Sequence, residues 1–230
     1  MARRLVFVPS PDKELVKEFE FSFKWEPTGM YGKGAIDENV SSLHRECADT
    51  HGITTDRILE VSGASSKTLG KQLSAMNLCI EDRNDTGVNE GSKWCVESLY
   101  QGSKVFENGG PHHVMYTYTG YAAKKAIKSR HLGKLVGFNY HGIEYPIDPP
   151  DAFYNWLYIS VLCDENNTGL VNSLLDGPDY FGFTDIFFNH DRQVACQARA
   201  IAKFISMSNA YYTRKEATNF EIYKEQRSRK

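Results

Sequence analysis

The stretch VESLYQGSKVF, residues 96–106, places a carboxylate, an amide and an amine on one side of a predicted helix. Glu97, Gln101 and Lys104 stand at positions i, i+4 and i+7, so at about 100° per residue they lie within about 60° of one another. The pattern predicts a helix from about residue 93 to residue 107, because the NGGP that follows is a strong stop signal. Three different polar groups therefore share one helical face.

Apolar residues surround this polar row. Leu99 and Phe106 point the opposite way, and Tyr100 and Val105 flank the row, so the helix is expected to be enclosed with the row facing a cavity. A carboxylate and an amine in a dry pocket have perturbed pKa values, as catalytic groups often do. The alternative is an exposed face with a surface ion pair, which contributes almost no stability. Spacing alone leaves both interpretations open.

The composition indicates a folded protein with no global preference for nucleic acid or membrane. Of 230 residues, 41% are hydrophobic and 13% aromatic, and the net charge is −2. No apolar run approaches the roughly 18–20 residues of a membrane span, and the apolar patch near the N-terminus is too short for a secretory signal. The five cysteines form no CxxC pair, which favours free buried thiols. A cytoplasmic location away from membranes is expected.

The remaining pattern predicts an α+β fold: a single domain with a predominantly helical core and a few short strands. The expected elements are two strands within residues 4–25, strands at 57–63 and 73–82, helices at 36–51, 121–134, 152–165 and 193–208, and a hairpin at 135–147 turning at His141 and Gly142. The domain is expected to cover residues 1–212. The charged segment 213–230 is expected to be a solvated helix or a frayed end.

The polar row belongs to a longer series of motifs. Glu97-x3-Gln101-x2-Lys104-x-Phe106 resembles the S-E-H-Y-F-Q-A-x-K-F element of the NADAR superfamily of N-glycosidases. LSAMNL (73–78) is similar to the L-S-N-F strand of that superfamily. DYFGFTD (179–185) followed by CQAR (196–199) is similar to its closing W-G-D and N-x-L-G segment. The order of the motifs along the chain also matches.

Five phrases resemble the branch of NADAR antitoxins that is paired with DarT toxins. They are QLSAMNL, VESLYQGSKVFENGGP, FYNWLYI, FTDIFFN and CQARA, spread in matching order over roughly residues 57–205. Three features depart from the wider superfamily. IFFNHDRQVA (186–195) replaces its glycine-rich loop, Gln197 stands where it has asparagine, and the tryptophan precedes the glutamate by three residues instead of four.

This resemblance implies an ADP-ribosyl glycohydrolase. The implied substrate is ADP-ribosylated guanine in DNA, single-stranded or as a nucleotide, and the implied partner is a functionally linked DarT-type toxin whose modification the enzyme reverses. No cofactor is implied. Two alternatives remain open, namely an N-glycosidase of early riboflavin intermediates and a non-catalytic antitoxin that binds nucleic acid or toxin.

The resemblance also assigns residue roles. The expected catalytic residues are Glu97, Lys104 and Asp185, and the expected substrate contacts are Asn77, Trp94, Gln101, Arg130, Asn189 and Gln197. Glu97 could stabilise an oxocarbenium-like centre or activate water. Lys104 could instead displace the amine of the base and form a Schiff base. Asp185 is the second carboxylate, as an acid or as a ligand of a ribose hydroxyl.

Other polar clusters give weaker signals. One basic cluster could hold a pyrophosphate or a DNA backbone, or could simply be solvated: Lys124, Lys125, Lys128, Arg130, His131 and Lys134. No third ligand has suitable spacing to the pair His112 and His113, so no metal site is predicted. The segment GASSKTLGK (63–71) does not satisfy the phosphate-loop pattern, although its serines could still touch phosphate.

Overall fold

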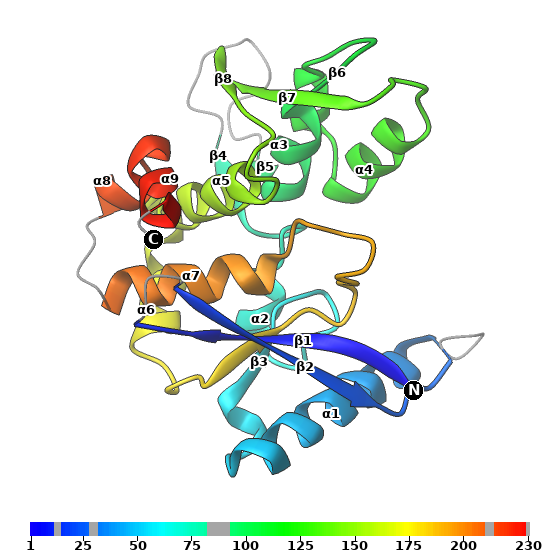
Figure 1. The fold of residues 1–230 in the computed structure, drawn as a ribbon, viewed down its shortest axis with the longest axis vertical. Coiled ribbons are helices and arrows are strands. Elements are labelled where there is room, and N and C mark those ends of the chain that lie inside the picture. Colours follow the sequence, from blue (N-terminus) through cyan, green and yellow to red (C-terminus); the bar gives the residue numbers. More distant parts are fainter. Residues whose placement is uncertain (12–14, 28–31, 82–92, 210–213, 229–230) are drawn as a thin grey trace.

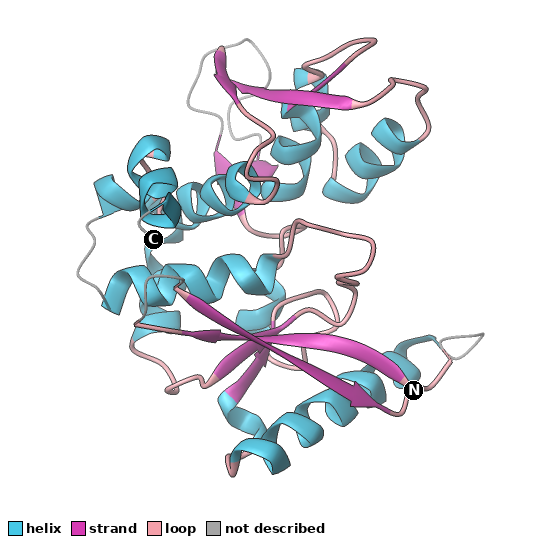
Figure 2. Ribbon diagram, in the orientation of Figure 1, coloured by secondary structure: helices cyan, strands magenta, loops and turns pink. Residues whose placement is uncertain are grey.

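The lower body of the protein is built around a four-stranded sheet (Figure 1). The computed structural model describes residues 1–11, 15–27, 32–81, 93–209 and 214–228. Strands β1 (Ala2–Pro9) and β2 (Val16–Phe23) pair antiparallel over their whole length, from Ala2 opposite Phe23 to Pro9 opposite Val16. The short strands β9 (Gly182–Thr184) and β3 (Ile58–Glu60) extend the sheet in the order β2-β1-β9-β3, with β3 and β9 parallel (Figure 2).

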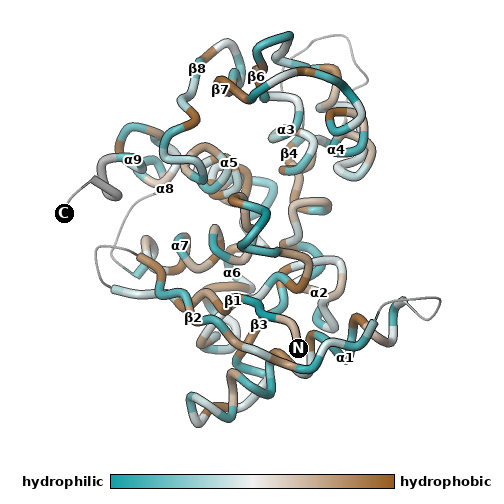
Figure 3. Tube along the Cα trace, turned by 45° about the vertical axis from the view of Figure 1, so that its right-hand side comes forward, coloured by the Kyte–Doolittle hydropathy of each residue, from teal (hydrophilic) through white to brown (hydrophobic). Residues whose placement is uncertain are grey.

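One helix covers each face of this sheet (Figure 1). Helix α1 (Gly32–His51) lies on one face, where Phe21 and Phe23 of β2 pack with Leu43. Its hydropathy alternates along the chain (Figure 3), as expected of a helix with a single buried side. Helix α7 (Gln197–Asn209) lies on the other face and is the predicted helix near 193–208. The predictions of the N-terminal strands and of α1 are confirmed.

The main hydrophobic core lies between α7 and the upper part of the molecule. Helix α5 (Ala152–Leu162) is buried at nearly every position, which explains its continuous apolar sequence. It contacts α7, α3 and the C-terminal helices. Helix α6 (Thr168–Leu175) follows it through a 3-10 turn at Glu165–Asn167, and the sequence pattern does not predict α6. The fold is mixed α/β with a largely helical core, as predicted.

The predicted helix over residues 93–107 is wrong at both ends. Residues 93–95 form strand β5 (Lys93–Cys95), which pairs with β4 (Cys79–Glu81). The helix itself, α3, spans Val96–Ser103, and β6 (Lys104–Phe106) follows without a loop. Both ends of the predicted helix are therefore strands, because each end pairs with another strand. The first end pairs with β4 and the second with β7 (Leu135–Tyr140).

The hairpin of β7 and β8 (Ile143–Tyr145) confirms the predicted turn. His141 and Gly142 have φ angles of 51° and 78°, the left-handed region that a two-residue hairpin turn requires. Helix α4 (Gly120–Lys128) is shorter than the predicted 121–134. A 3-10 helix at His113–Thr117 leads into it, and another at Thr55–Arg57 precedes β3.

The predicted strand at 73–82 is also largely wrong. Helix α2 spans Thr68–Gln72, and a turn follows in which the amides of Asn77 and Leu78 both donate to the Ser74 carbonyl at 2.8 Å. Only the end of the segment is extended, as β4. The alternating pattern LSAMNL therefore reflects a turn that is buried at its two ends, where Leu73, Ala75 and Leu78 enter the main core.

The C-terminal segment forms helices α8 (Arg214–Ala217) and α9 (Phe220–Ser228). One face of them is buried, since Tyr223 is only 1% exposed, and the Trp156 indole donates to the Thr218 carbonyl at 2.8 Å. The segment is helical, as one of the two alternatives predicted, but the expectation that it is solvated is wrong, because its few apolar residues are spaced to meet α5. All five cysteines carry free thiols, as predicted. Within the described ranges, no helix is both long and apolar enough to cross a membrane.

Candidate functional site

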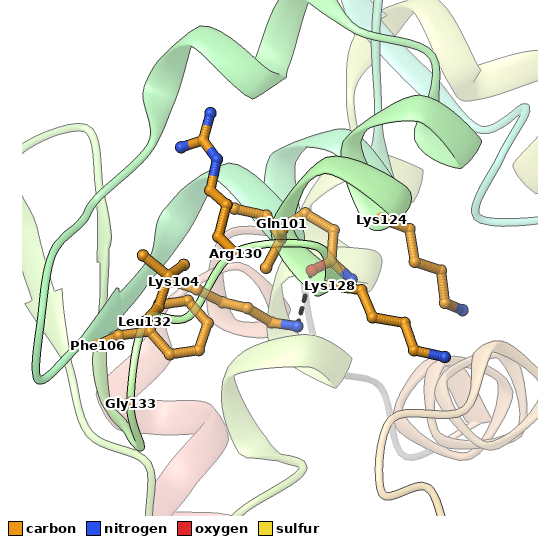
Figure 4. Close-up of a pocket in the computed structure, with 9 residues that line it drawn as sticks. Gln101, Lys104, Phe106, Lys124, Lys128, Arg130, Leu132 and Gly133 are labelled. Atoms are coloured by element: carbon orange, nitrogen blue, oxygen red, sulfur yellow. Dashed lines mark hydrogen bonds between the residues drawn. The ribbon is translucent and has the colours of Figure 1, made fainter.

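Glu97, Gln101 and Lys104 form one continuous hydrogen-bonded chain. The Gln101 Nε2 donates to Glu97 Oε1 at 2.8 Å, and the Lys104 Nζ donates to Gln101 Oε1 at 2.8 Å (Figure 4). These contacts fix the orientation of the amide, with its oxygen toward the cation and its nitrogen toward the carboxylate. Glu97 and Gln101 are only 6% and 5% exposed, so the polar row is enclosed and not an ordinary solvated face.

The position of Glu97 is set by three segments of backbone. Its own amide donates to the Ala75 carbonyl at 2.9 Å, and it stands in the first turn of α3, where the helix dipole favours a carboxylate. Gly120 begins α4 so close by that an added Cβ would lie 2.9 Å from the Glu97 Cβ and 2.6 Å from the Met76 sulfur. This close approach brings the Lys124 Nζ, one turn later in α4, to 3.8 Å from Glu97 Oε1.

Burial makes Lys104 an unusual lysine. Loss of solvation lowers its pKa to about 8, against the opposing attraction of Glu97 and with a further lowering by the charge of Lys124. Its Nζ also lies 4.5 Å from the centre of the Tyr100 ring, and in its protonated form it makes a cation–π contact with that ring. At pH 7 about one Lys104 in eleven is therefore the free amine, the only form that can attack carbon.

A cavity of about 370 Å³ opens beside Gln101 and Lys104. Its lining residues are Gln101, Lys104, Phe106, Lys124, Ile127, Lys128, Arg130, Leu132 and Gly133. The charged residues among them are all cationic, which suits an anionic ligand. Lys124 and Lys128 extend in the same direction from α4, whereas the Arg130 guanidinium points away from them and its Nη1 lies 3.4 Å from Nδ1 of His112 (Figure 4).

Asp185 is connected to the same site through the backbone of Ala75. Its Oδ2 accepts from Gln197 Nε2 at 2.9 Å, and Gln197 Oε1 accepts from the Ala75 amide at 2.6 Å. Because the Ala75 carbonyl holds the Glu97 amide, the two carboxylates are anchored on opposite sides of one residue. Burial and the charge of Glu60 raise the pKa of Asp185 to about 7, while its hydrogen bonds and Lys124 oppose the rise.

The comparison with known families fits this geometry. The model of the DarT1-associated NADAR antitoxin family matches residues 2–230. The chain belongs to this family. The resemblance inferred from the motifs is thus confirmed, and it extends over the C-terminal helices as well. NADAR membership indicates N-glycosidase-like hydrolase chemistry, and the description of the family ties it to a DarT toxin. No curated protein shows a significant match to the chain.

Four other residues predicted to contact substrate in this NADAR family member are occupied by local contacts. Asn77 is exposed, and its Nδ2 donates to the Lys71 carbonyl at 2.8 Å. Asn189 Oδ1 caps a turn by accepting from the Asp191 amide at 3.0 Å. Trp94 is buried against Tyr116, with ring centres 5.4 Å apart. Both polar atoms of Gln197 are engaged as described above. Their roles in substrate binding stay predictions, whereas Gln101, Lys104 and Arg130 do line the cavity.

Sequence reasoning missed Tyr154 of α5. Its ring meets that of Tyr100 edge to face at 4.9 Å, directly behind Lys104. Burial raises the pKa of Tyr154 strongly, and the charges of both Glu97 and Asp185 contribute to this rise. The side chain is therefore close enough to both carboxylates of this NADAR site to be affected by their charges. In sequence it is one aromatic among several in an apolar helix, so only its position in three dimensions distinguishes it.

Proposed function

We propose that the protein hydrolyses the N-glycosidic bond between ADP-ribose and guanine in DNA, and so reverses the modification made by a DarT-type toxin in the cytoplasm. The observation that carries the proposal is the buried Glu97–Gln101–Lys104 chain, which ends with a lysine of lowered pKa at the wall of a cationic cavity. Family membership supports the N-glycosidase class and the toxin association, and the chemistry of the site supports the finer assignment.

The cavity suits the charge of ADP-ribose. Its volume of about 370 Å³ lies within the usual range of ligand sites, roughly 300–1,000 Å³. Lys124 and Lys128 line the same cavity as Lys104, where two cations can hold the pyrophosphate while the distal ribose reaches the polar row. Lys128 makes no ion pair with any residue in the described part of the chain, so its charge is available to a ligand.

The outer ridge of α4 suits nucleic acid. Tyr121, Lys125 and Lys128 recur at i, i+4 and i+7 and share one side of the helix, with Tyr121 72% exposed. An exposed tyrosine at the end of a row of lysines can stack on a base while the lysines neutralise phosphates. This ridge runs from the mouth of the cavity, because Lys128 belongs to both. DNA that carries the modified guanine would lie along it.

The lysine route accounts best for the state of Lys104. Asp185 protonates the ring oxygen of the ribose as the carbon–oxygen bond breaks and the guanine nitrogen forms a double bond to the anomeric carbon. The free amine of Lys104 adds to that carbon, a proton passes from its nitrogen to the guanine amine, and the bond to guanine breaks, which leaves a Schiff base. Water activated by Glu97 then hydrolyses the Schiff base to ADP-ribose and restores the amine.

An oligonucleotide with one ADP-ribosylated guanine tests the proposal. The wild type is expected to remove the group, whereas Glu97→Gln and Lys104→Ala lose at least about 100-fold in rate, the usual contribution of a general acid, base or nucleophile. Lys125→Ala, an exposed lysine of α4 that does not line the cavity, is the matched control and should retain activity on a mononucleotide substrate. Full activity of both site variants would refute the site, and no removal by wild type would refute the function.

Borohydride separates the lysine route from the oxocarbenium route. Reduction during turnover should attach the sugar irreversibly to Lys104, which peptide mass spectrometry locates. In the alternative route Glu97 stabilises the charge at the anomeric carbon directly, and no adduct forms. Turnover without any adduct on Lys104 would therefore reject the Schiff base and leave the glycosidase assignment intact.

A further inference from the structure

Glu60, the last residue of β3, is a buried carboxylate outside the cavity beside Lys104. It is 3% exposed and stands opposite Thr184 in the parallel pair of β3 and β9. Its Oε2 accepts from Thr184 Oγ1 at 2.7 Å, and its Oε1 accepts from the Ile186 amide at 3.0 Å. The residue between these two donors is Asp185. One carboxylate thus accepts hydrogen bonds from the residue immediately before Asp185 and from the residue immediately after it. Asp185 is the acid of the proposed reaction.

Fold stability does not explain this arrangement. Burying a carboxylate is costly unless a cation pairs with it, and an apolar residue of similar volume usually serves a core as well. Three groups donate to Glu60, the two named above and the Ser62 hydroxyl, but no lysine or arginine of the described ranges forms an ion pair with it. The cost of keeping a negative charge here is therefore offset by some role of that charge.

We propose that Glu60 is a positioning residue for the proposed glycosidase reaction, and that it acts through Asp185 by holding the Thr184 hydroxyl and the Ile186 amide on either side of it and by placing a second carboxylate near it. The inference rests on the proposed function, in which Asp185 delivers a proton to the sugar. Glu60 lines a second cavity, beside α1, and not the cavity at Lys104, so its part in the proposed reaction is to act through Asp185.

The electrostatics agree with the geometry. Burial raises the pKa of both carboxyls, and hydrogen bonds oppose the rise, three at Glu60 and two at Asp185, so we expect Glu60 to ionise first. The charge of Glu60 then helps to hold the pKa of Asp185 at about 7, where it keeps a proton to give. The other groups that face Asp185 are Lys124 from α4, Arg4 from β1, Tyr154 and Tyr158 from α5, and Cys196 and Gln197 at the start of α7.

His44 of α1 is the last member of the hydrogen-bonded series that runs from Glu60 through Thr184. Its Nε2 lies 2.8 Å from Thr184 Oγ1, and the single hydroxyl proton of Thr184 already points to Glu60, so His44 donates. Burial lowers the pKa of His44 to about 4, which keeps the ring neutral. A neutral His44 cannot cancel the charge of Glu60. The cations on that side are Arg45 and Lys67, which line the same cavity as Glu60, and neither forms an ion pair with it within the described residues.

A pH profile of kcat/KM tests the proposal. The wild type should show a limb near pH 7 where Asp185 titrates. In Glu60→Gln, which keeps the shape and removes the charge, that limb should move to lower pH by about one unit. With such a shift the protonated fraction of Asp185 at pH 7.5 falls from about 24% to about 3%, so activity should fall about eight-fold there. Asp56→Asn, an exposed carboxylate near β3, is the control and should leave the limb in place.

Two outcomes overturn the proposal. A uniform loss of activity at every pH with the limb unmoved would show a purely structural role for Glu60. Carbon-13 titration of labelled aspartate and glutamate carboxyls in the wild type supplies a second test that needs no stable variant. Glu60 should ionise before Asp185, and the reverse order would also reject the inference. This titration remains decisive even if the wild type removes no ADP-ribose, so the failures of the two proposals are distinguishable.

Discussion

Replacing Glu97 with glutamine should make Lys104 more reactive toward small reagents that acetylate amines, even as it lowers turnover. Glutamine keeps the oxygen that accepts from Gln101 Nε2, so the chain from residue 97 to Lys104 remains intact. What the change removes is a negative charge that raises the pKa of Lys104 against the effect of burial. The pKa of Lys104 should therefore fall below its value of about 8.

The size of the effect is bounded by the titration of Lys104. With a pKa of about 8, roughly one molecule in eleven carries the free amine at pH 7, compared with about one in 3,000 for a lysine at 10.5. Removing the charge of Glu97 can thus raise the free-amine fraction at pH 7 by no more than about eleven-fold. At pH 10 the amine is already free in both proteins, so their labelling rates should converge.

Competitive acetylation followed by peptide mass spectrometry measures this fraction. Lys104 lines the cavity and is accessible to a small reagent, and exposed Lys125 of α4 serves as the internal reference. Glu144→Gln, an exposed carboxylate of β8, is the matched control and should leave the labelling midpoint unchanged. A wild-type midpoint near 10.5, or a midpoint that rises in Glu97→Gln, would contradict the electrostatic account of the site.

Three further results are expected. Tyr121→Ala should lower activity on an oligonucleotide several-fold and leave activity on a modified mononucleotide unchanged, because only the oligonucleotide can stack on α4. Equal losses of activity on both substrates would argue against DNA binding along that ridge. Gly120→Ala should cost about 1–3 kcal/mol of stability and most of the activity, because its Cβ would lie 2.9 Å from the Glu97 Cβ, whereas Gly169→Ala, with open space around it, should be neutral in urea unfolding. Asp185→Asn should gain stability relative to wild type as pH rises from 4 to 7. A raised folded pKa means that the wild type loses stability over this window, by at most about 4 kcal/mol, and an equal difference at pH 4 and pH 8 would count against a pKa of about 7.

Local sequence was enough for the elements whose burial pattern is regular. The strands β1 and β2, the helices α1, α5 and α7 and the turn of the β7–β8 hairpin follow from periodicity and turn chemistry. The row of Glu97, Gln101 and Lys104 also follows from spacing, although Lys104 turned out to begin a strand. Its side chain still reaches Gln101, because a residue three positions away at a helix end remains within hydrogen-bonding distance.

Other features depend on contacts between distant parts of the chain. The end of α3 at Ser103 is decided by β7, which pairs with Lys104 from residue 138, and no local signal at Lys104 announces this. The meeting of Asp185 with Glu97 runs through Gln197 and the backbone of Ala75, which lie far apart in sequence. The turn at 73–78 makes that bridge, where alternation alone predicts a strand.

The sequence by itself therefore determined which chemical groups make up the candidate polar row, since residue type and helical spacing are local properties. Only the tertiary structure decided what state these groups are in. The pKa of Lys104 near 8 and that of Asp185 near 7 arise from loss of solvent and from charges on other elements, Lys124 of α4 and Glu60 of β3. Burial and Coulomb interaction depend on distance in space, and the folded chain alone sets those distances.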